Sequence, residues 1–178
     1  GGSSMDTAKA ISVLLDNPGM ISDYYARNTS EFSSRIPLIL LPTSSGTGSE
    51  VTGLCVIHDT ASHAKIPVYR SANLAIVDPM LTVSAPPAVT AASAFDAMSH
   101  ALEAYTSKYH TEKVDTLALQ AIQLIAENIL VAYEDGSNVI ARENLAFASN
   151  IAGIAFNEVS VHIGHAIAHE FGLQFHLP

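Results

Sequence analysis

The feature that most constrains the fold is a change of hydrophobic pattern at Pro86 and Pro87. Before this pair, short apolar runs alternate with turn residues, which is typical of an α/β arrangement. After it, apolar residues recur at a period near 3.6, which predicts a bundle of helices. We therefore expect two parts, residues 1–86 and residues 87–178, with an α/β architecture followed by an all-α one.

The first part contains one expected helix and two kinds of expected strand. Helical spacing of apolar residues predicts a helix from Asp6 to Leu15, with its N-terminus at the preceding glycine turn. Two apolar runs that end in proline or polar residues predict buried strands, Ile36–Thr43 and Leu74–Pro79. The segments 51–59 and 65–70 are predicted to form a hairpin around the loop 60–64. In the second part, residues 87–107, 114–135 and 138–157 are each predicted to be helical.

Charge and composition exclude several classes of function. The formal net charge is −9 with eight Lys and Arg in total, which argues against a surface that follows nucleic-acid phosphates. No apolar run reaches the roughly 18 residues of a membrane span. Cys55 is the only cysteine, so we expect a reducing cytoplasm and no disulfides. Hydrophobic residues make up 48% and charged residues 14%, which predicts apolar surface that a partner or further chain covers.

Two glycine-containing segments could bind an anionic ligand. The first residues, Gly1 to Asp6, lead into a helix whose N-terminal amides and dipole favour a phosphate group; an ordinary capped turn is the alternative. The loop from Pro42 to Glu50 follows an expected strand and carries several hydroxyls, at the end of the sheet where α/β proteins place their ligands. It lacks the lysine of a Walker loop, and a solvent-exposed loop is the alternative.

Four residues form two pairs with i, i+4 spacing, Asp96 with His100 and His165 with His169. On a helix, each pair projects from one face. A carboxylate and imidazoles suit zinc or ferrous iron, with one position left for a substrate oxygen. Histidines that serve packing alone are the alternative. His162 extends the second pair into a predicted helical stripe, and one of these rings could transfer protons instead of binding metal.

Five segments in this order resemble the iron-containing (group III) alcohol dehydrogenases, whose relatives include glycerol dehydrogenase and dehydroquinate synthase: GGSSMDTAK, PTSSGTGSEVT, AIVDPMLTVSAPP, AFDAMSHALEAY and GHAIAHEFG. The resemblance implies the dehydroquinate synthase-like fold, an α/β nucleotide-binding part followed by an all-α helical domain, both incomplete here. It places NAD or NADP and a divalent metal, iron first and zinc second, in the cleft between them. It also implies a homo-oligomer for the complete enzyme.

The resemblance assigns roles residue by residue. It implies metal ligation by Asp96, His100 and His165, while His169 matches a catalytic neighbour of the nicotinamide. The family's fourth ligand belongs to a PHG motif whose proline matches Pro178, so we expect this ligand to be missing; His176 is not its substitute. The positions implied to bind the cofactor are Gly1, Gly2, Ser3, Asp6, Thr43, Ser44, Ser45, Gly46, Thr47, Gly48, Lys65 and Leu81.

The implied activity is reversible hydride transfer between a small alcohol or diol and its aldehyde or ketone. Three alternatives stay open. The chain could be a catalytically inactive fragment, a relative of dehydroquinate synthase or glycerol dehydrogenase, or a bundle with a purely structural histidine cluster. Few Lys and Arg residues disfavour the polyanionic substrate of a dehydroquinate synthase.

Overall fold

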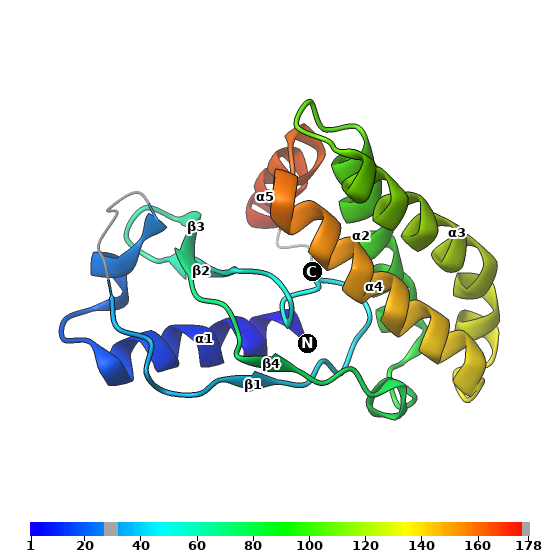
Figure 1. Ribbon diagram of the computed structural model, residues 1–178, viewed down its shortest axis with the longest axis horizontal. Helices are drawn as coiled ribbons and strands as arrows, with labels where there is room; N and C mark the ends of the chain where they lie inside the picture. The colour runs from blue at the N-terminus through cyan, green and yellow to red at the C-terminus, as the bar shows by residue number, and fades with distance from the viewer. Residues whose placement is uncertain (27–31, 176–178) are drawn as a thin grey trace.

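The computed structural model describes residues 1–26 and 32–175, which form an α/β half and a helical half (Figure 1). A parallel pair and an antiparallel pair of strands accompany the first helix, and the four helices α2 to α5 follow. Strands β1 (Ile39–Leu40) and β4 (Leu74–Ala75) pair in parallel. Strands β2 (Leu54–Asp59) and β3 (Ala64–Tyr69) form an antiparallel hairpin in which His58 lies opposite Lys65. The elements of the α/β half are α1 (Gly2–Asp16), η1 (Ile21–Tyr24), β1 (Ile39–Leu40), β2 (Leu54–Asp59), β3 (Ala64–Tyr69), β4 (Leu74–Ala75) and η3 (Pro79–Thr82).

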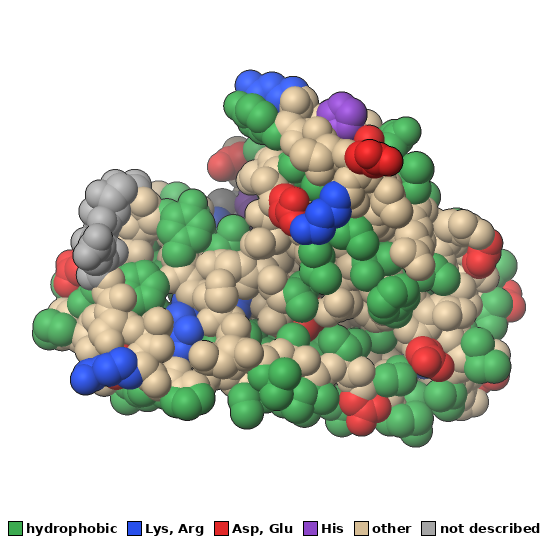
Figure 2. All heavy atoms as spheres, viewed as in Figure 1, with side chains coloured by type: hydrophobic (Ala, Val, Ile, Leu, Met, Phe, Trp, Pro, Cys, Tyr) green, Lys and Arg blue, Asp and Glu red, His purple; other side chains and the backbone are tan. Residues whose placement is uncertain are grey.

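The predicted hairpin and first helix are confirmed, whereas the two predicted buried strands are only partly right. Strands β1 and β4 keep two residues each, and Ile39 and Leu74 are 53% and 50% exposed. A two-stranded ladder leaves one face without a partner layer, so alternate side chains remain exposed to solvent. Figure 2 shows hydrophobic side chains over this edge of the molecule, as the low charge content predicted.

The hairpin packs against α1 through a small core that includes Val13, Cys55 and Val68, each fully buried. Lys9 is also fully buried, and its ammonium donates to the carbonyls of Thr52 (3.0 Å) and Leu54 (2.7 Å). Burial lowers the pKa of Lys9 and the nearby Asp6 opposes this shift. The lysine thus joins α1 to the start of β2 through buried hydrogen bonds.

Cys55 provides a test of this core. Burial, followed by the nearby Asp6, raises the pKa of its thiol to about 11. We expect Ellman's reagent to leave Cys55 unlabelled at pH 8 in the folded chain and to label it in urea. Because the folded pKa lies above the unfolded one, the buried thiol's stabilising effect is complete below about pH 9. It is lost as the pH rises towards 11. Cys55→Ala should show no labelling in either state, and stoichiometric labelling of the folded wild-type chain would contradict this core.

The helical half consists of α2 (Pro87–Tyr105), α3 (Glu112–Glu134), α4 (Val139–Val159) and α5 (Ile163–Phe175). Local residues start these helices. Pro87 occupies the first turn of α2, where its missing N–H costs nothing. The side chain of Thr111 accepts from the Val114 amide at the start of α3, and that of Asn138 accepts from the Ala141 amide at the start of α4.

The bundle core is built mainly from alanines, which let helices α2, α3 and α4 approach closely. Ala97, Ala101 and Ala104 of α2 are fully buried at helical spacing. Within the described ranges, α3 is the one helix long and apolar enough to span a membrane. It packs on both α2 and α4, and its residues Ala118 and Ile125 are fully buried, so one face of α3 lies in the bundle core.

Candidate functional site

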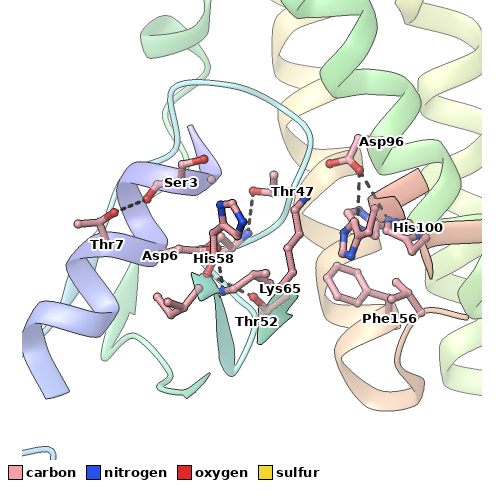
Figure 3. A pocket seen from close by; sticks show the side chains of 17 residues that line it. Ser3, Asp6, Thr7, Thr47, Thr52, His58, Lys65, Asp96, His100 and Phe156 are labelled. Carbon is pink, nitrogen blue, oxygen red and sulfur yellow. Dashed lines mark hydrogen bonds and ion pairs between the residues drawn. The ribbon is translucent and has the colours of Figure 1, made fainter. Parts of the chain in front are cut away.

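Helix α2 presents two adjacent stripes of side chains. The alanine stripe faces α3 and α4, and its burial fixes the rotation of the helix. The neighbouring stripe carries Asp96, His100 and Glu103, at i, i+4 and i+7. Figure 3 shows Asp96 and His100 pointing into a cavity whose other side is lined by residues of the α/β half. The packing of the alanines therefore directs this polar stripe towards the cleft.

Helix α5 supplies the second part of the site. The chain turns at Ser160, which has a positive φ of 64° and whose amide donates to the Phe156 carbonyl at the end of α4. His165 and His169 then line the same cavity. His162 directly precedes α5, and its carbonyl accepts from the Ala166 amide of the first turn. Its Nε2 lies 3.2 Å from Thr106 Oγ1 and 3.2 Å from the Glu103 carbonyl oxygen, and His162 is not among the described residues that line the cavity.

Three of the predicted residues converge. The ligand atoms of Asp96, His100 and His165 all lie within 4.8 Å of one another. Asp96 Oδ1 is 3.9 Å from His100 Nε2 and 3.7 Å from His165 Nε2. The two imidazoles stack at 4.5 Å between ring centroids, and Phe156 stacks on the other face of His100 at 4.2 Å. Both rings are thus held by packing with one nitrogen turned towards the carboxylate.

These residues fit a divalent metal. Neighbouring ligands of a tetrahedral zinc ion lie about 3.4 Å apart, given metal–ligand distances of about 2.1 Å. The two separations from Asp96 Oδ1, 3.7 and 3.9 Å, exceed this by a few tenths of an ångström, and the ligand atoms of His100 and His165 lie within 4.8 Å of each other. Side-chain movements of about an ångström would close the site. One carboxylate and two imidazoles also match the ligand preference of iron(II) and zinc. The described residues therefore offer three ligands and leave the remaining coordination positions to other groups.

The electrostatics favour the metal-binding forms of Asp96 and His100 and favour the protonated form of His165. Burial tends to protonate Asp96, but the neighbouring rings of His165 and His100 outweigh burial and hold the pKa of Asp96 below its ordinary value. Burial lowers the pKa of His100 despite Asp96. Burial, then Lys65, lowers the pKa of His169 as well. The pKa of His165 is raised, because Asp96 and Glu103 together outweigh its burial. An ionised Asp96 and a neutral His100 at neutral pH are the ligand forms that a metal requires.

Glu103 is the residue that sequence reasoning missed. Its carboxylate lies 2.6 Å from His165 Nδ1, on the ring nitrogen opposite to the one that faces Asp96. The available signal was its place three residues after His100, on the same helical stripe. His58 was also missed, and it lines the cavity beside Lys65 from the β2–β3 hairpin (Figure 3).

The cavity between the two halves has a volume of about 560 Å³ and runs from the start of α1 to the three converging residues. Ser3, Asp6, Thr47 and Lys65, four of the residues predicted to bind the cofactor, line it. An overlapping cavity of about 1100 Å³ also reaches Ser3, Thr47 and Lys65. Gly2 lies close beneath the loop, since a Cβ there would meet Thr47 Cγ2 at 2.7 Å. The α1 N-terminus and the hydroxyl-rich loop therefore form one wall.

Other predicted cofactor residues are in different surroundings. Ser44 and Ser45 line a smaller cavity with Thr82, and Leu81 lies in η3, 38% exposed. Gly1 N lies 3.1 Å from Thr43 Oγ1, and a Cβ on Gly46 would meet the Ser93 carbonyl of α2 at 2.9 Å. The described residues that line the 560 Å³ and 1100 Å³ cavities do not include these predicted positions. Their cofactor role stays a prediction.

Helix α4 holds the loop in place. Gly48 has a positive φ of 60°, and a Cβ on it would lie 2.7 Å from Gly153 Cα, so loop and helix touch through their backbones. Asn150 Nδ2 donates to Glu50 Oε1 at 3.3 Å, and the Gly53 amide donates to Asn157 Oδ1 at 2.7 Å. The α4 seam, residues Gly153, Asn150 and Asn157, thereby fixes the loop relative to the histidine cluster.

Comparison with known proteins agrees with this architecture. Residues 90–178 match the Fe-containing alcohol dehydrogenase family, C-terminal, and residues 1–79 match the iron-containing alcohol dehydrogenase family. The chain is 43% identical over 175 residues to the NAD-dependent methanol dehydrogenase of Bacillus methanolicus, covering 97% of this chain and 46% of the relative. It is 41% identical over 181 residues to the sulfoacetaldehyde reductase of Bilophila wadsworthia, covering 100% and 46%.

A solved structure shares the fold. The crystal structure of sulfoacetaldehyde reductase from Bifidobacterium kashiwanohense in complex with NAD+ superposes with a TM-score of 0.93 at 35% identity, covering all of this chain and 48% of that one. The chain thus spans about half the length of the curated relatives it matches. An α/β part, a helical bundle and an Asp-His-His cluster in the cleft are all present, and the chain belongs to the iron-containing alcohol dehydrogenase family.

Proposed function

We propose that the chain forms the cofactor and metal cleft of an NAD(P)-linked, metal-dependent alcohol dehydrogenase. The observation that carries this proposal is the continuity of one cavity. At one end lie Asp96, His100 and His165, with their ligand atoms within 4.8 Å, and at the other lie Ser3 and Thr47. A cofactor bound to the second end could extend its reactive ring towards the first.

Each group has a proposed role. The start of α1, from Gly1 to Asp6, and the loop from Thr43 to Gly48 receive the pyrophosphate of NAD or NADP through amides and hydroxyls, with Lys65 and Leu81 completing the cofactor site. Asp96, His100 and His165 hold the metal, iron in preference to zinc. When bound, the metal stabilises the negative charge on a substrate oxygen.

His169 is proposed to transfer the substrate's proton. It lines the cavity, and its ring lies 6.2 Å from that of His165, outside the ligand cluster. Burial and Lys65 lower its pKa, so its imidazole is neutral at neutral pH and can accept a proton.

We infer a small alcohol or diol and its aldehyde or ketone as substrates. Relatives that act on methanol and sulfoacetaldehyde by name support this class. A polyanionic substrate is disfavoured, because Lys65 is the one Lys or Arg among the described residues that line the two cavities. The unpaired Cys55 and the exposed apolar edge at β1 and β4 support a cytoplasmic location and a homo-oligomer.

A binding and turnover experiment tests the function. We expect the chain, loaded with iron(II) or zinc, to quench or shift NADH or NADPH fluorescence on binding. We also expect metal-dependent change in absorbance at 340 nm with small alcohols or aldehydes. Thr47→Val removes a cavity-lining hydroxyl but keeps the size, and should weaken cofactor binding. Cofactor binding that is absent, or equally strong in this variant, would contradict the proposed cofactor wall; binding without turnover would identify an inactive fragment.

A further inference from the structure

Glu103 is a buried carboxylate that lies on the side of the His165 ring remote from Asp96. It lies in α2 one turn after His100 and is 7% exposed. Its Oε1 lies 2.6 Å from His165 Nδ1, and its Oε2 accepts from the His162 amide at 2.5 Å. Ser99 Oγ donates weakly to Oε1 at 3.3 Å. Glu103 therefore joins α2 to the start of α5 and to one of the three ligand candidates.

The contacts of Glu103 place a hydrogen-bond donor beside each of its oxygens. Oε2 accepts from the His162 amide, and Oε1 lies beside both Ser99 Oγ and His165 Nδ1. Because a carboxylate oxygen accepts hydrogen bonds, the 2.6 Å contact places the hydrogen on His165 Nδ1. The lone pair of the neutral ring is then on Nε2, the atom 3.7 Å from Asp96 Oδ1.

The surrounding residues leave room for this contact. A Cβ on Gly164 would lie 2.7 Å from Glu103 Oε1, so a larger residue at this position would displace the carboxylate. His100, in contrast, has a buried Nδ1 without a hydrogen-bond partner among the described residues. Among the described residues, Glu103 is thus the carboxylate that contacts Nδ1 of a proposed ligand histidine, the ring nitrogen that does not face Asp96.

We propose that Glu103 is the positioning residue of the metal centre. It holds His165 in the tautomer that offers Nε2 to the metal, fixes the ring plane, and increases the basicity of the coordinating nitrogen. It does so without touching metal or substrate itself. This inference rests on the metal site proposed above, so its test includes a measurement that needs no metal.

The metal-free measurement is the tautomer of His165. In the 178-residue chain with ¹⁵N-labelled histidine, long-range ¹H–¹⁵N NMR at a pH above the measured titration of His165 should show the neutral ring protonated on Nδ1. A His165→Gln spectrum identifies its signals. We expect Glu103→Ala to give a mixture dominated by the other tautomer, the usual preference of free imidazole. An unchanged tautomer in Glu103→Ala would overturn the proposal.

The second measurement is zinc affinity by competition with a chromophoric chelator at pH 7.5. Glu103→Ala should weaken binding about 10- to 100-fold, the usual effect of losing such a partner. Glu103→Gln keeps an oxygen acceptor and should retain the tautomer with a smaller loss. Glu143→Ala, an exposed glutamate of α4, is the matched control and should bind as wild type.

The two measurements separate the two hypotheses. If wild type binds no zinc but His165 is protonated on Nδ1 in a Glu103-dependent way, the metal site fails and the positioning contact stands. If zinc binds and Glu103→Ala binds it equally well, the metal site stands and the positioning role is overturned. Circular dichroism melting checks folding, and if neither Glu103 variant folds, Glu103 serves stability alone and the proposal is also overturned.

Discussion

Asp96→Ala is expected to abolish measurable zinc or iron(II) binding, weakening affinity at least about 100-fold. Asp96 is the single carboxylate of the cluster, and its Oδ1 lies within 4 Å of both Nε2 atoms. Removal leaves two imidazoles and no anionic ligand to offset the charge of the ion. The measurement is a competition titration with a chromophoric chelator on the purified chain, with metal content after dialysis as a second readout.

The matched control for this experiment is Asp115→Ala. Asp115 also pairs with a histidine, His110, at 3.0 Å, but it lies at the start of α3 and outside the cavity. Its loss should leave metal affinity within about threefold, as expected of a surface ion pair. If Asp96→Ala binds metal as tightly as Asp115→Ala, the ligand assignment is wrong.

Gly48→Val is expected to lower the free energy of unfolding by about 3–5 kcal/mol. Two costs add. The residue has a φ of 60°, a conformation that is strained for a β-branched side chain, and its Cβ would lie 2.7 Å from Gly153 Cα. Backbone cannot rotate away as a side chain can, so the loop must separate from α4. Urea denaturation followed by circular dichroism measures the loss.

Gly53→Ala is the control for this seam. A Cβ on Gly53 would come no closer than 3.3 Å, to the hydroxyl of Ser71, and the residue has no positive φ. We expect a change below about 1 kcal/mol. A similar cost for both substitutions would show that the Gly48 contact with α4 does not determine stability.

Much of the fold could be predicted from local pattern. The period of apolar residues located α2, α3 and α4 closely, and two short β-rich runs around a turn located the β2–β3 hairpin. The strands β1 and β4 are shorter and more exposed than predicted. An apolar run indicates that a segment can pair, but not how many neighbours will cover it.

The candidate site was predictable where it depends on the spacing of residues within one helix. The i, i+4 spacing of Asp96 and His100 is a property of a single helix, and the structure has both residues on one face of α2. His162, at the start of the predicted stripe, directly precedes α5 and contacts Thr106 and Glu103, and it is not among the described residues that line the cavity. Glu103 was overlooked, because its place on the same helical stripe as His100 does not indicate which side chain of another helix it will meet.

The sequence by itself determined the family motifs, the division between strand-rich and helical segments, and which residues share a helix face. These properties depend on residues within a few positions of one another. Only the tertiary structure decided that α5 folds back onto α2, that Glu103 contacts His165, and that Gly48 meets Gly153. Such contacts join residues distant in the chain, and they arise from the packing of whole helices, which local spacing does not specify.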